Sequence, residues 1–344
     1  MIVSVVCPCR NEIGNIDRFL RGLAHQHVDE FELEVIVADG ESTDGTSEAL
    51  EAWRARGRGR VLIPNPDRIV STGLNAAIQI ARGEVIIRMD VHTQYAEDYV
   101  AQCLRALKQT GATCVGGAWL AKGYSPRQRA IAAGFGSPFG SGGAKSRRPD
   151  YNGAVDTVYL GAWWRADLIA LSGFDESLIR NQDDELCLRI TRSGGSLWQS
   201  SSIRSHYLPR DTFQALWQQF YEYGYWKAAV IRKHRRFASL RQLAPTSVVV
   251  LLLALVVAGF FDPAAWLILA ACLIAYVAAA FLAASLAIRS HRPTKLALVV
   301  VSFVCMHLGY GLGLGRGVLD FFIFGRLPSG GPVAFLGSGD VSSR

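Results

Sequence analysis

Apolar runs alternate with amphipathic stretches over the first 116 residues. The runs are rich in β-branched residues and predict five strands, at 2–7, 33–38, 61–64, 84–89 and 113–116. Between the first two, residues 15–26 carry apolar side chains at helical spacing, and Asn15 is the predicted N-cap of that helix. Strands that alternate with helices predict a parallel α/β sheet, with the ligand at the carboxyl ends of the strands.

Polar clusters follow three of these predicted strands, at residues 8–12, 39–46 and 90–92. Asp39 can accept a hydrogen bond from the imide N–H of a pyrimidine, although DGESTDGT also reads as an ordinary capped turn. Asp90 and His92, two residues apart at an extended tip, point toward one side and can hold Mg²⁺ or Mn²⁺. Neither a GxGxxG nor a GxxxxGK[ST] pattern occurs, which disfavours a classical dinucleotide fold and a P-loop.

A fourth polar cluster opens a predicted helix at residues 181–186, with the sequence NQDDEL. Three consecutive acidic residues, which include Asp183 and Asp184, suit the positive end of the helix dipole. That many carboxylates in one turn also suit a general base.

The last third of the chain is strongly apolar. Runs at 246–261, 264–288 and 296–314 are each near the roughly 20 residues that cross a bilayer. They predict a membrane domain at 244–325 with about three transmembrane helices. The third run contains His307 and a glycine-rich stretch, and a re-entrant segment is the alternative to a third span there.

Basic residues predict how this region is oriented. The loop after the second apolar run carries Arg289, Arg292 and Lys295, which the positive-inside rule places in the cytoplasm together with residues 1–243. Residues 211–243 mix aromatic side chains with a Lys/Arg cluster, which predicts amphipathic helices in the headgroup layer. An ordinary solvated basic helix is the alternative for this segment. Residues 326–344 are the expected C-terminal tail.

Composition supports this division of the chain. The 344 residues are 50% hydrophobic and 19% charged, which excludes disorder as the main state. The net charge of +7 does not predict nucleic-acid binding, because residues 1–203 hold 22 basic and 24 acidic side chains and the excess lies beyond them. Seven cysteines without CxxC or zinc spacing predict packing roles in a reduced, cytosolic setting.

Taken together, the motifs resemble those of family 2 glycosyltransferases with a GT-A fold. They are Pro-x-x-Asn-Glu at 8–12, Asp-Gly-x-Ser-x-Asp-Gly-Thr at 39–46, an Asp-x-Asp-like motif at 90–92 and a Glu-Asp-like motif at 182–183. Three longer segments look like the succinoglycan-type exopolysaccharide enzymes: RGEVIIRMDVHT (82–93), VDTVYLGAWWR (155–165) and GFDESLIRNQDDELCLR (173–189). The resemblance covers about residues 1–235. It implies a GT-A nucleotide-diphospho-sugar transferase domain at 1–210, an α/β fold with a Rossmann-like mixed sheet, followed by C-terminal transmembrane helices.

The resemblance also implies roles for individual residues. The donor nucleotide would contact Pro8, Glu12, Asp39, Arg68 and Asp90, with Asp39 on the base. The metal, Mg²⁺ or Mn²⁺, would be held by Asp90, His92 and His206. Asp183 would be the catalytic base, but Gln182 stands where the family usually has Glu, which leaves Asp184 open as the alternative.

The acceptor side of the site is less well marked. The Gln-x-x-Arg-Trp motif of polymerising members has only a loose counterpart in residues 219–227. Gln219 and Trp226 are the candidates there, with Trp226 stacking on an acceptor sugar or else anchoring the helix. Arg210 and His206 either reach the diphosphate or have structural roles.

The function expected from the resemblance is metal-assisted, inverting hexosyl transfer in exopolysaccharide synthesis. The donor would be a nucleotide sugar such as UDP-glucose, and the acceptor a saccharide on a polyprenyl diphosphate lipid. The enzyme would be a multi-pass protein of the bacterial inner membrane with its catalytic domain in the cytoplasm. The alternatives are transfer to polyprenyl phosphate, processive synthesis, or a catalytically silent nucleotide-sugar-binding component of an export complex.

Overall fold

The computed structural model describes residues 1–28, 30–235, 240–288 and 293–326. The chain forms two compact units. The first contains residues 1–119 and 148–207, and the second contains residues 120–147 with the described residues from 208 onward.

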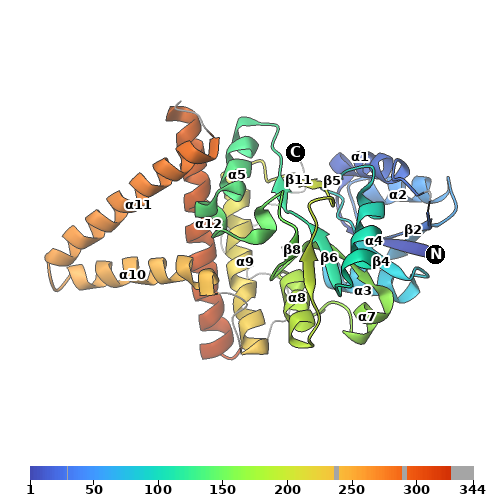
Figure 1. The fold of residues 1–344 in the computed structure, drawn as a ribbon. Helices are drawn as coiled ribbons and strands as arrows, with labels where there is room; N and C mark the ends of the chain where they lie inside the picture. Colours follow the sequence, from blue (N-terminus) through green and yellow to red (C-terminus); the bar gives the residue numbers. More distant parts are fainter. Residues whose placement is uncertain (29, 236–239, 289–292, 327–344) are drawn as a thin grey trace. The chain divides into compact units, whose positions relative to one another are not determined.

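The first unit is built on an eight-stranded mixed sheet (Figure 1). Its strands are β1 (Ile2–Cys9), β2 (Glu32–Asp39), β3 (Arg60–Pro64), β4 (Val85–Arg88), β6 (Cys114–Gly117), β8 (Gly153–Ala154), β9 (Tyr159–Trp164) and β10 (Leu197–Gln199). They lie in the order β3-β2-β1-β4-β9-β6-β10-β8. The first four are parallel, whereas β9 runs antiparallel to both of its neighbours. The five predicted strands are all present, and the α/β fold class is confirmed.

Helices cover both faces of this sheet. One face packs against α1 (Ile13–Ala24), α2 (Thr46–Arg54) and α4 (Tyr99–Thr110), and the other against α3 (Val70–Ile80), α7 (Arg165–Ala170) and α8 (Gln182–Arg192). Side chains alternate along a strand, so Val5 of β1 enters the first core and Val6 the second. The N-cap prediction was wrong, because α1 begins at Ile13 and Asn15 lies inside its first turn.

The strand order places a topological switch point beside β1. The chain goes from β1 through α1 to β2 on one side, whereas β4 joins β1 on the other side. Ligands of open α/β sheets bind outside the carboxyl ends of the strands at such a point. The clusters that follow β1, β2 and β4 all lie at this edge.

A buried polar network braces the opposite ends of β1 and β2. The Ser4 hydroxyl donates to Glu34 Oε2 at 2.6 Å, and Arg82 donates from Nε to Glu34 Oε1 at 2.7 Å. Burial raises the pKa of Glu34, but the hydrogen bonds from Ser4 and Arg82 outweigh it and hold that pKa below its usual value. Glu34 is therefore an ionised structural residue.

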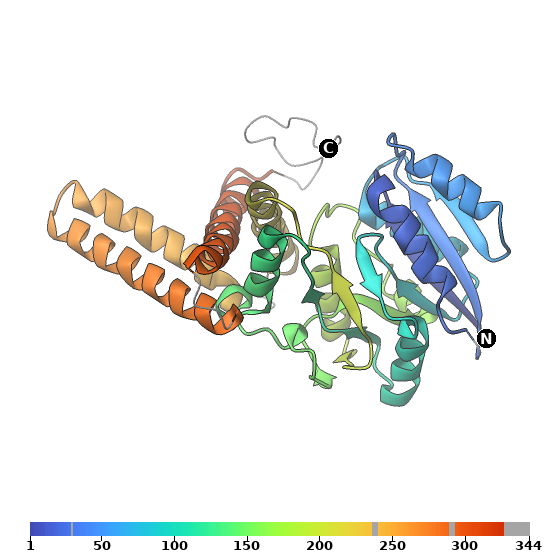
Figure 2. The ribbon, with the colours of Figure 1, turned by 90° about the horizontal axis from the view of Figure 1, so that it is seen from above.

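The second unit is helical. It contains β7 (Leu120–Ala121), α5 (Pro126–Gly136), α6 (Pro138–Ser141), η1 (Lys145–Arg147), α9 (Phe213–His234), η2 (Leu240–Leu243), α10 (Ala244–Gly259), α11 (Ala264–Ile288), α12 (Pro293–Val318) and a π-helical turn, η3 (Leu319–Ile323). Figures 1 and 2 both show α10 and α11 as a hairpin that projects away from α9 and α12. α9 and α12 lie side by side, in contact along their length.

Two of the apolar helices are long enough to cross a membrane. They are Ala264–Ile288, with 25 residues, and Lys295–Ile323, with 29 residues. The first predicted span forms only a 16-residue helix, α10. At 1.5 Å per residue α10 is about 24 Å long, less than the roughly 30 Å hydrocarbon core. Of the three predicted spans, the second and third thus have the length of a membrane span, and the first is a shorter apolar helix.

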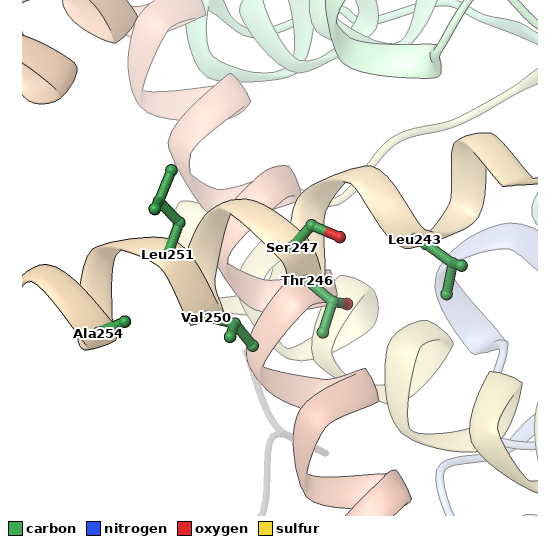
Figure 3. Close-up of a pocket in the computed structure, with 6 residues that line it drawn as sticks. All are labelled: Leu243, Thr246, Ser247, Val250, Leu251 and Ala254. Atoms are coloured by element: carbon green, nitrogen blue, oxygen red, sulfur yellow. The ribbon is translucent and has the colours of Figure 1, made fainter.

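The surface of α10 is largely apolar. A hollow of about 470 Å³ lies at its start. Figure 3 shows the residues that line it, which are Leu243, Thr246, Ser247, Val250, Leu251 and Ala254. Farther along the hairpin, the side chains of Phe261 and Leu267 are 86% and 75% exposed. Exposed apolar surface of this extent marks a site of contact with another phase or partner.

Candidate active site

The loops after β1 and β2 are joined by hydrogen bonds. The backbone N–H of Asn11 donates to Ser42 Oγ at 2.9 Å, and Asn11 Oδ1 accepts from the backbone of Thr43 at 2.9 Å. The backbone N–H of Glu12 donates to Thr46 Oγ1, also at 2.9 Å. The two family-like motifs therefore form one continuous wall at the edge of the sheet.

Asp39 lies buried at the base of this wall, where β2 ends. Its Oδ1 accepts a hydrogen bond from Ser42 Oγ at 2.6 Å, and its Oδ2 accepts one from Ser47 Oγ. The two serines fix the orientation of the carboxylate. The backbone N–H of Ser42 also donates to Oδ1, at 3.3 Å, so the second lone pair of Oδ2 is the one that can still accept from a ligand N–H.

Strained backbone is concentrated around this edge. Among the described residues, four non-glycine residues of the loops at the site have positive φ, namely Asn11, Glu41, Arg68 and Asn181, and Leu160 of β9 also has a positive φ. Leu160 is the most demanding of them, because a bulky side chain rarely adopts this conformation. Such strain persists where surrounding structure imposes it, and it clusters at functional sites.

Arg68 and Glu41 form an ion pair at the rim, with Arg68 Nε 2.8 Å from Glu41 Oε2. Both side chains are about half exposed, so the pair can open at little cost. Arg68 lies in the loop between β3 and α3, and the ion pair joins this loop to the one that follows Asp39.

Asp90, just beyond β4, is held by a bidentate ion pair with Arg88. Arg88 Nε lies 2.8 Å from Asp90 Oδ1, and its second terminal nitrogen lies 3.0 Å from Oδ2. Burial raises the pKa of Asp90, but the Arg88 guanidinium outweighs it and holds that pKa below its usual value. The Tyr95 hydroxyl accepts from the backbone N–H of Asp90 at 2.6 Å. Asp90 is therefore ionised and rigidly oriented.

His92 faces the wall formed by the loops after β1 and β2 across a short gap. Its Nδ1 lies 3.7 Å from Glu12 Oε1, so the loops after β1 and β4 meet at this point. The His92 ring packs edge-on against Tyr207, with centroids 5.5 Å apart. Tyr207 in turn contacts Trp119, which stacks on Tyr159 at 5.4 Å. An aromatic wall therefore borders the Asp90–His92 tip.

The acidic start of α8 closes the other side. Asp183 lies within electrostatic range of Arg88, and Asp183 Oδ1 accepts from the backbone N–H of Asp184 at 2.9 Å. Asp184 instead contacts Thr157, and its Oδ1 accepts a hydrogen bond from Thr157 Oγ1 at 3.2 Å. Glu185 is fully buried and bonded to Arg189, so its role is structural. Gln182 is buried as well, at the first residue of the helix.

The sequence is similar to known glycosyltransferases. The sequence model described as Glycosyl transferase family 2 matches residues 4–164. The succinoglycan biosynthesis protein ExoA of Rhizobium meliloti (strain 1021) is 30% identical over 323 residues, which is 92% of this chain and 95% of that protein. The chain belongs to glycosyltransferase family 2. It is thus a glycosyltransferase related to a protein of exopolysaccharide synthesis.

Solved structures agree with the fold of this family 2 glycosyltransferase. The mannosyltransferase PcManGT from Pyrobaculum calidifontis, in complex with GDP-Man and Mn²⁺, matches with a TM-score of 0.63 and 18% identity, over 92% of this chain and 87% of that one. S. aureus TarS 1–349 in complex with UDP-GlcNAc matches with a TM-score of 0.52 and 15% identity, over 95% and 93%. The sheet is therefore that of a GT-A fold.

The predicted metal set of this glycosyltransferase is only partly assembled. The described part of the chain has no group of three or more His, Cys, Asp or Glu side chains that could hold a metal ion. Tyr207 of β11 (Ser205–Tyr207) packs on His92, so the preceding residue, His206, points to the opposite face of that strand. Asp90 and His92 remain, and a carboxylate with an imidazole fits Mn²⁺ or Mg²⁺ as two protein ligands.

Three predicted acceptor-side residues lie in the second unit. Arg210 is exposed, whereas Gln219 and Trp226 are buried in α9. The Trp226 ring is 5.7 Å from Tyr225 and 6.2 Å from Phe321. At 2% exposure Trp226 has no open face for a sugar, and its packing matches the anchoring alternative.

Sequence reasoning missed several residues of the site. Arg88 lies in the segment RGEVIIRMDVHT (82–93), but the motifs gave it no role. An arginine in a buried strand indicates a buried partner, which was the signal that could have found it. Ser47 could not be linked to Asp39 from spacing alone. Tyr207 and Trp119 come from distant segments, and only the fold shows that Tyr207 lies beside His92 and Trp119 beside Tyr207.

Proposed function

We propose that this family 2 enzyme transfers a hexose, with inversion, from a nucleotide-diphospho-sugar to a saccharide carried on a polyprenyl diphosphate lipid. The observation that carries the proposal is the convergence of three acidic groups at the switch point of the sheet. Asp39 lies in the donor wall, Asp90 at the tip of β4, and Asp183 at the start of α8, with Arg88 between the last two.

The donor nucleotide fits the wall between β1 and β2. Asp39, oriented by Ser42 and Ser47, is suited to accept the imide N–H of uracil, which favours a UDP-sugar. Glu12 and Pro8 line the same edge. Arg68 at the rim supplies a cation that can leave Glu41 for a donor phosphate, because the exposed pair between them is weak. The relative ExoA, a succinoglycan biosynthesis protein, supports a role in exopolysaccharide synthesis.

Asp183 is the better of the two candidates for the general base. It lies toward the Arg88–Asp90 pair, whereas Asp184 is engaged with Thr157 on another face of the helix. Asp183 would take the proton of the acceptor hydroxyl as that oxygen forms its bond to the anomeric carbon. The bond from that carbon to the diphosphate breaks on the opposite face, and its electron pair leaves with the nucleoside diphosphate. An α-linked donor then yields a β-linkage.

Asp90 and His92 would hold Mn²⁺ or Mg²⁺. Such an ion neutralises charge on the departing diphosphate. Arg88 fixes the Asp90 carboxylate in one orientation, and the aromatic wall formed by Tyr207, Trp119 and Tyr159 limits water at the tip. The structural neighbour PcManGT, which was solved with GDP-Man and Mn²⁺, supports this assignment.

The apolar C-terminal helices support the proposal of a lipid-linked acceptor. An active site on a membrane-bound protein can act on a lipid-linked sugar without extracting it from the bilayer. The long apolar helices α11 and α12 and the exposed hairpin surface support this location at the inner membrane, with the sheet unit in the cytoplasm.

The test is the pair Asp183→Asn and Asp184→Asn in the purified full-length protein. We expect Asp183→Asn to lower transfer by at least about 10³-fold while leaving UDP affinity unchanged, because general-base catalysis typically contributes 10²–10⁴-fold. Asp184→Asn should keep transfer within about tenfold. Near-normal turnover of Asp183→Asn would refute the base assignment. Loss of UDP binding by both variants would show that the acidic turn has a structural role instead.

A further inference from the structure

The glycines of α12 bring it into backbone contact with α9. A Cβ on Gly309 would lie 3.0 Å from the carbonyl oxygen of Trp217. The pattern repeats every four residues, with Gly313 against the carbonyl of Tyr221 and Gly317 against that of Tyr225. Residue numbers rise together on the two helices, so α9 and α12 are parallel. Small residues at this spacing allow such close helix packing.

Charged groups are buried along the same helix pair. Asp320, in the π-helical turn that follows α12, is fully buried and accepts from Arg316 Nε and from a terminal nitrogen of Arg326, both at 2.9 Å. The Tyr225 hydroxyl of α9 donates to the same carboxylate at 3.2 Å. Lys227 of α9 is only 3% exposed. The protein, rather than lipid, surrounds this face of α12.

The first half of α12 is covered on its protein side by α5 and α6. Gly134 of α5 packs against Ser302 and Met306, and His307 Nε2 donates to the Phe139 carbonyl of α6 at 2.9 Å. α5 also carries the exposed cations Arg127 and Arg129. Along its whole length α12 therefore has one face against helices with polar and charged groups, which do not cross a bilayer readily.

The α10–α11 hairpin has the opposite character. Only 11% of the most apolar part of α11 is buried, against 44% of that part of Lys295–Ile323. Neither α10 nor α11 contains a charged residue, and apolar side chains are exposed along the hairpin up to its tip at Phe261 and Asp262. Figures 1 and 2 show this hairpin projecting away from the α9–α12 pair, so a membrane that receives the hairpin cannot also be crossed by α12 along the same direction.

We propose that the α10–α11 hairpin is the part of the chain that crosses the bilayer, while α12 lies along the cytoplasmic membrane surface with α9 on its protein side. The occupant of the hairpin surface is the lipid acyl chains. At 25 residues, or about 37 Å, α11 is long enough to carry Asp262 to the far headgroup layer. The shorter α10, about 24 Å long, is extended by the apolar residues Leu243 before it and Phe260 and Phe261 after it, which complete the first crossing. Cations at the end of α9, Arg232 and Lys233, and Lys295 at the start of α12 complement anionic headgroups on the near side.

This arrangement rests on the proposed membrane association and gives it a definite topology. Exposed apolar side chains of α12, such as Leu312 and Val318, together with Phe322 of η3, would dip into the interface. The end of α12 then lies on the same side of the membrane as the catalytic unit. A third transmembrane span would place it on the opposite side.

Labelling of single cysteines with a membrane-impermeant maleimide tests the topology in right-side-out and inverted vesicles. The positions are Arg105→Cys on α4, Asp262→Cys at the hairpin tip and Phe324→Cys after α12, all exposed. The background carries Cys272→Ser, because the other native cysteines are buried in the structure. The unsubstituted background reports residual labelling, and detergent-opened vesicles report full reactivity.

We expect Arg105→Cys and Phe324→Cys to be labelled from the same side, and Asp262→Cys from the other. Labelling of Phe324→Cys opposite to Arg105→Cys, or only after detergent, would overturn the proposal, as would labelling of Asp262→Cys on the Arg105 side. Sidedness does not depend on turnover, so sugar transfer is measured on the same variants. The expected sidedness without any transfer would refute the proposed function and leave this topology standing.

Discussion

Replacement of Arg88 by Met leaves the carboxylate of Asp90 in a buried position without its partner. In the native protein both oxygens of Asp90 are bound by Arg88, and the two side chains are only 8% and 13% exposed. Removing one partner of a buried ion pair costs roughly 3–5 kcal/mol, because the remaining charge is uncompensated. Replacing both partners by neutral groups costs much less. Arg88→Met should therefore be far more harmful to stability than Arg88→Met combined with Asp90→Asn.

The expected change is large enough for a thermal assay. For a unit of this size each kcal/mol shifts Tm by roughly 2–4 °C, so Arg88→Met should lower Tm by about 6–20 °C. A thiol-reactive dye can follow unfolding of the sheet unit, where Cys7, Cys103 and Cys114 are buried. Cys272→Ser and Cys305→Ser would remove the signal of the second unit.

The double variant is the control, because it removes the charge of Asp90 together with that of Arg88. Arg88→Met with Asp90→Asn should recover most of the lost Tm while remaining inactive, since the carboxylate proposed for the metal is gone. Arg88→Lys should fall between the wild type and Arg88→Met in Tm, because lysine keeps the charge without the bidentate geometry. A single variant as stable as the wild type, or a double variant no better than the single, would refute the account of this ion pair.

Three further predictions concern other parts of the chain. The pKa of Glu34 is lower in the folded state, so ionised Glu34 stabilises the fold at neutral pH, and this stabilisation is lost as pH falls through the folded-state pKa. In urea unfolding, Glu34→Gln should therefore be less stable than the wild type at pH 7. The variant should also lose less stability than the wild type as pH falls toward 4. Gly313→Val should force α9 and α12 apart and lower the folding stability by at least about 1–3 kcal/mol, which should reduce the folded fraction in detergent size-exclusion chromatography. Gly315→Val is the control and should be tolerated, because nothing lies within 4 Å of a Cβ at that position. In titration calorimetry, Asp39→Ala should weaken UDP binding by roughly tenfold or more, and Ser47→Ala, which removes one hydrogen bond to Asp39, should weaken it by less. An Asp39→Ala variant that binds UDP as tightly as the wild type would exclude a role of Asp39 in binding the base.

The sheet could be predicted because its signal is local. Apolar β-branched runs separated by helices are sufficient to identify β1 to β4 and β6, and polar residues directly after a parallel strand lie at the binding edge in any fold of this class. The antiparallel strand β9 inserts between β4 and β6, although it follows both in the chain. This order depends on long-range pairing, and no periodicity encodes it.

The site was predictable where the motif itself is continuous in sequence. Asp39, Asp90 and Asp183 came from such motifs, whereas the pairing of Arg88 with Asp90 and the facing of His92 and Tyr207 needed coordinates. The sequence left the packing of α12 open. Its glycines and His307 weakened the third apolar run as a predicted span, and in the structure they are the residues through which α12 packs on α9, α5 and α6.

The central claim is sugar transfer to a lipid-linked acceptor, and one assay addresses it most directly. Purified full-length protein is incubated with Mn²⁺, native membrane lipids and a panel of radiolabelled nucleotide sugars, and the products are separated by solvent extraction and by size. We predict that one UDP-hexose labels the lipid fraction with a product extended by a single sugar, and that Asp183→Asn abolishes it. Label that remains in the donor, appears only as free sugar, or enters a long polymer would contradict the account.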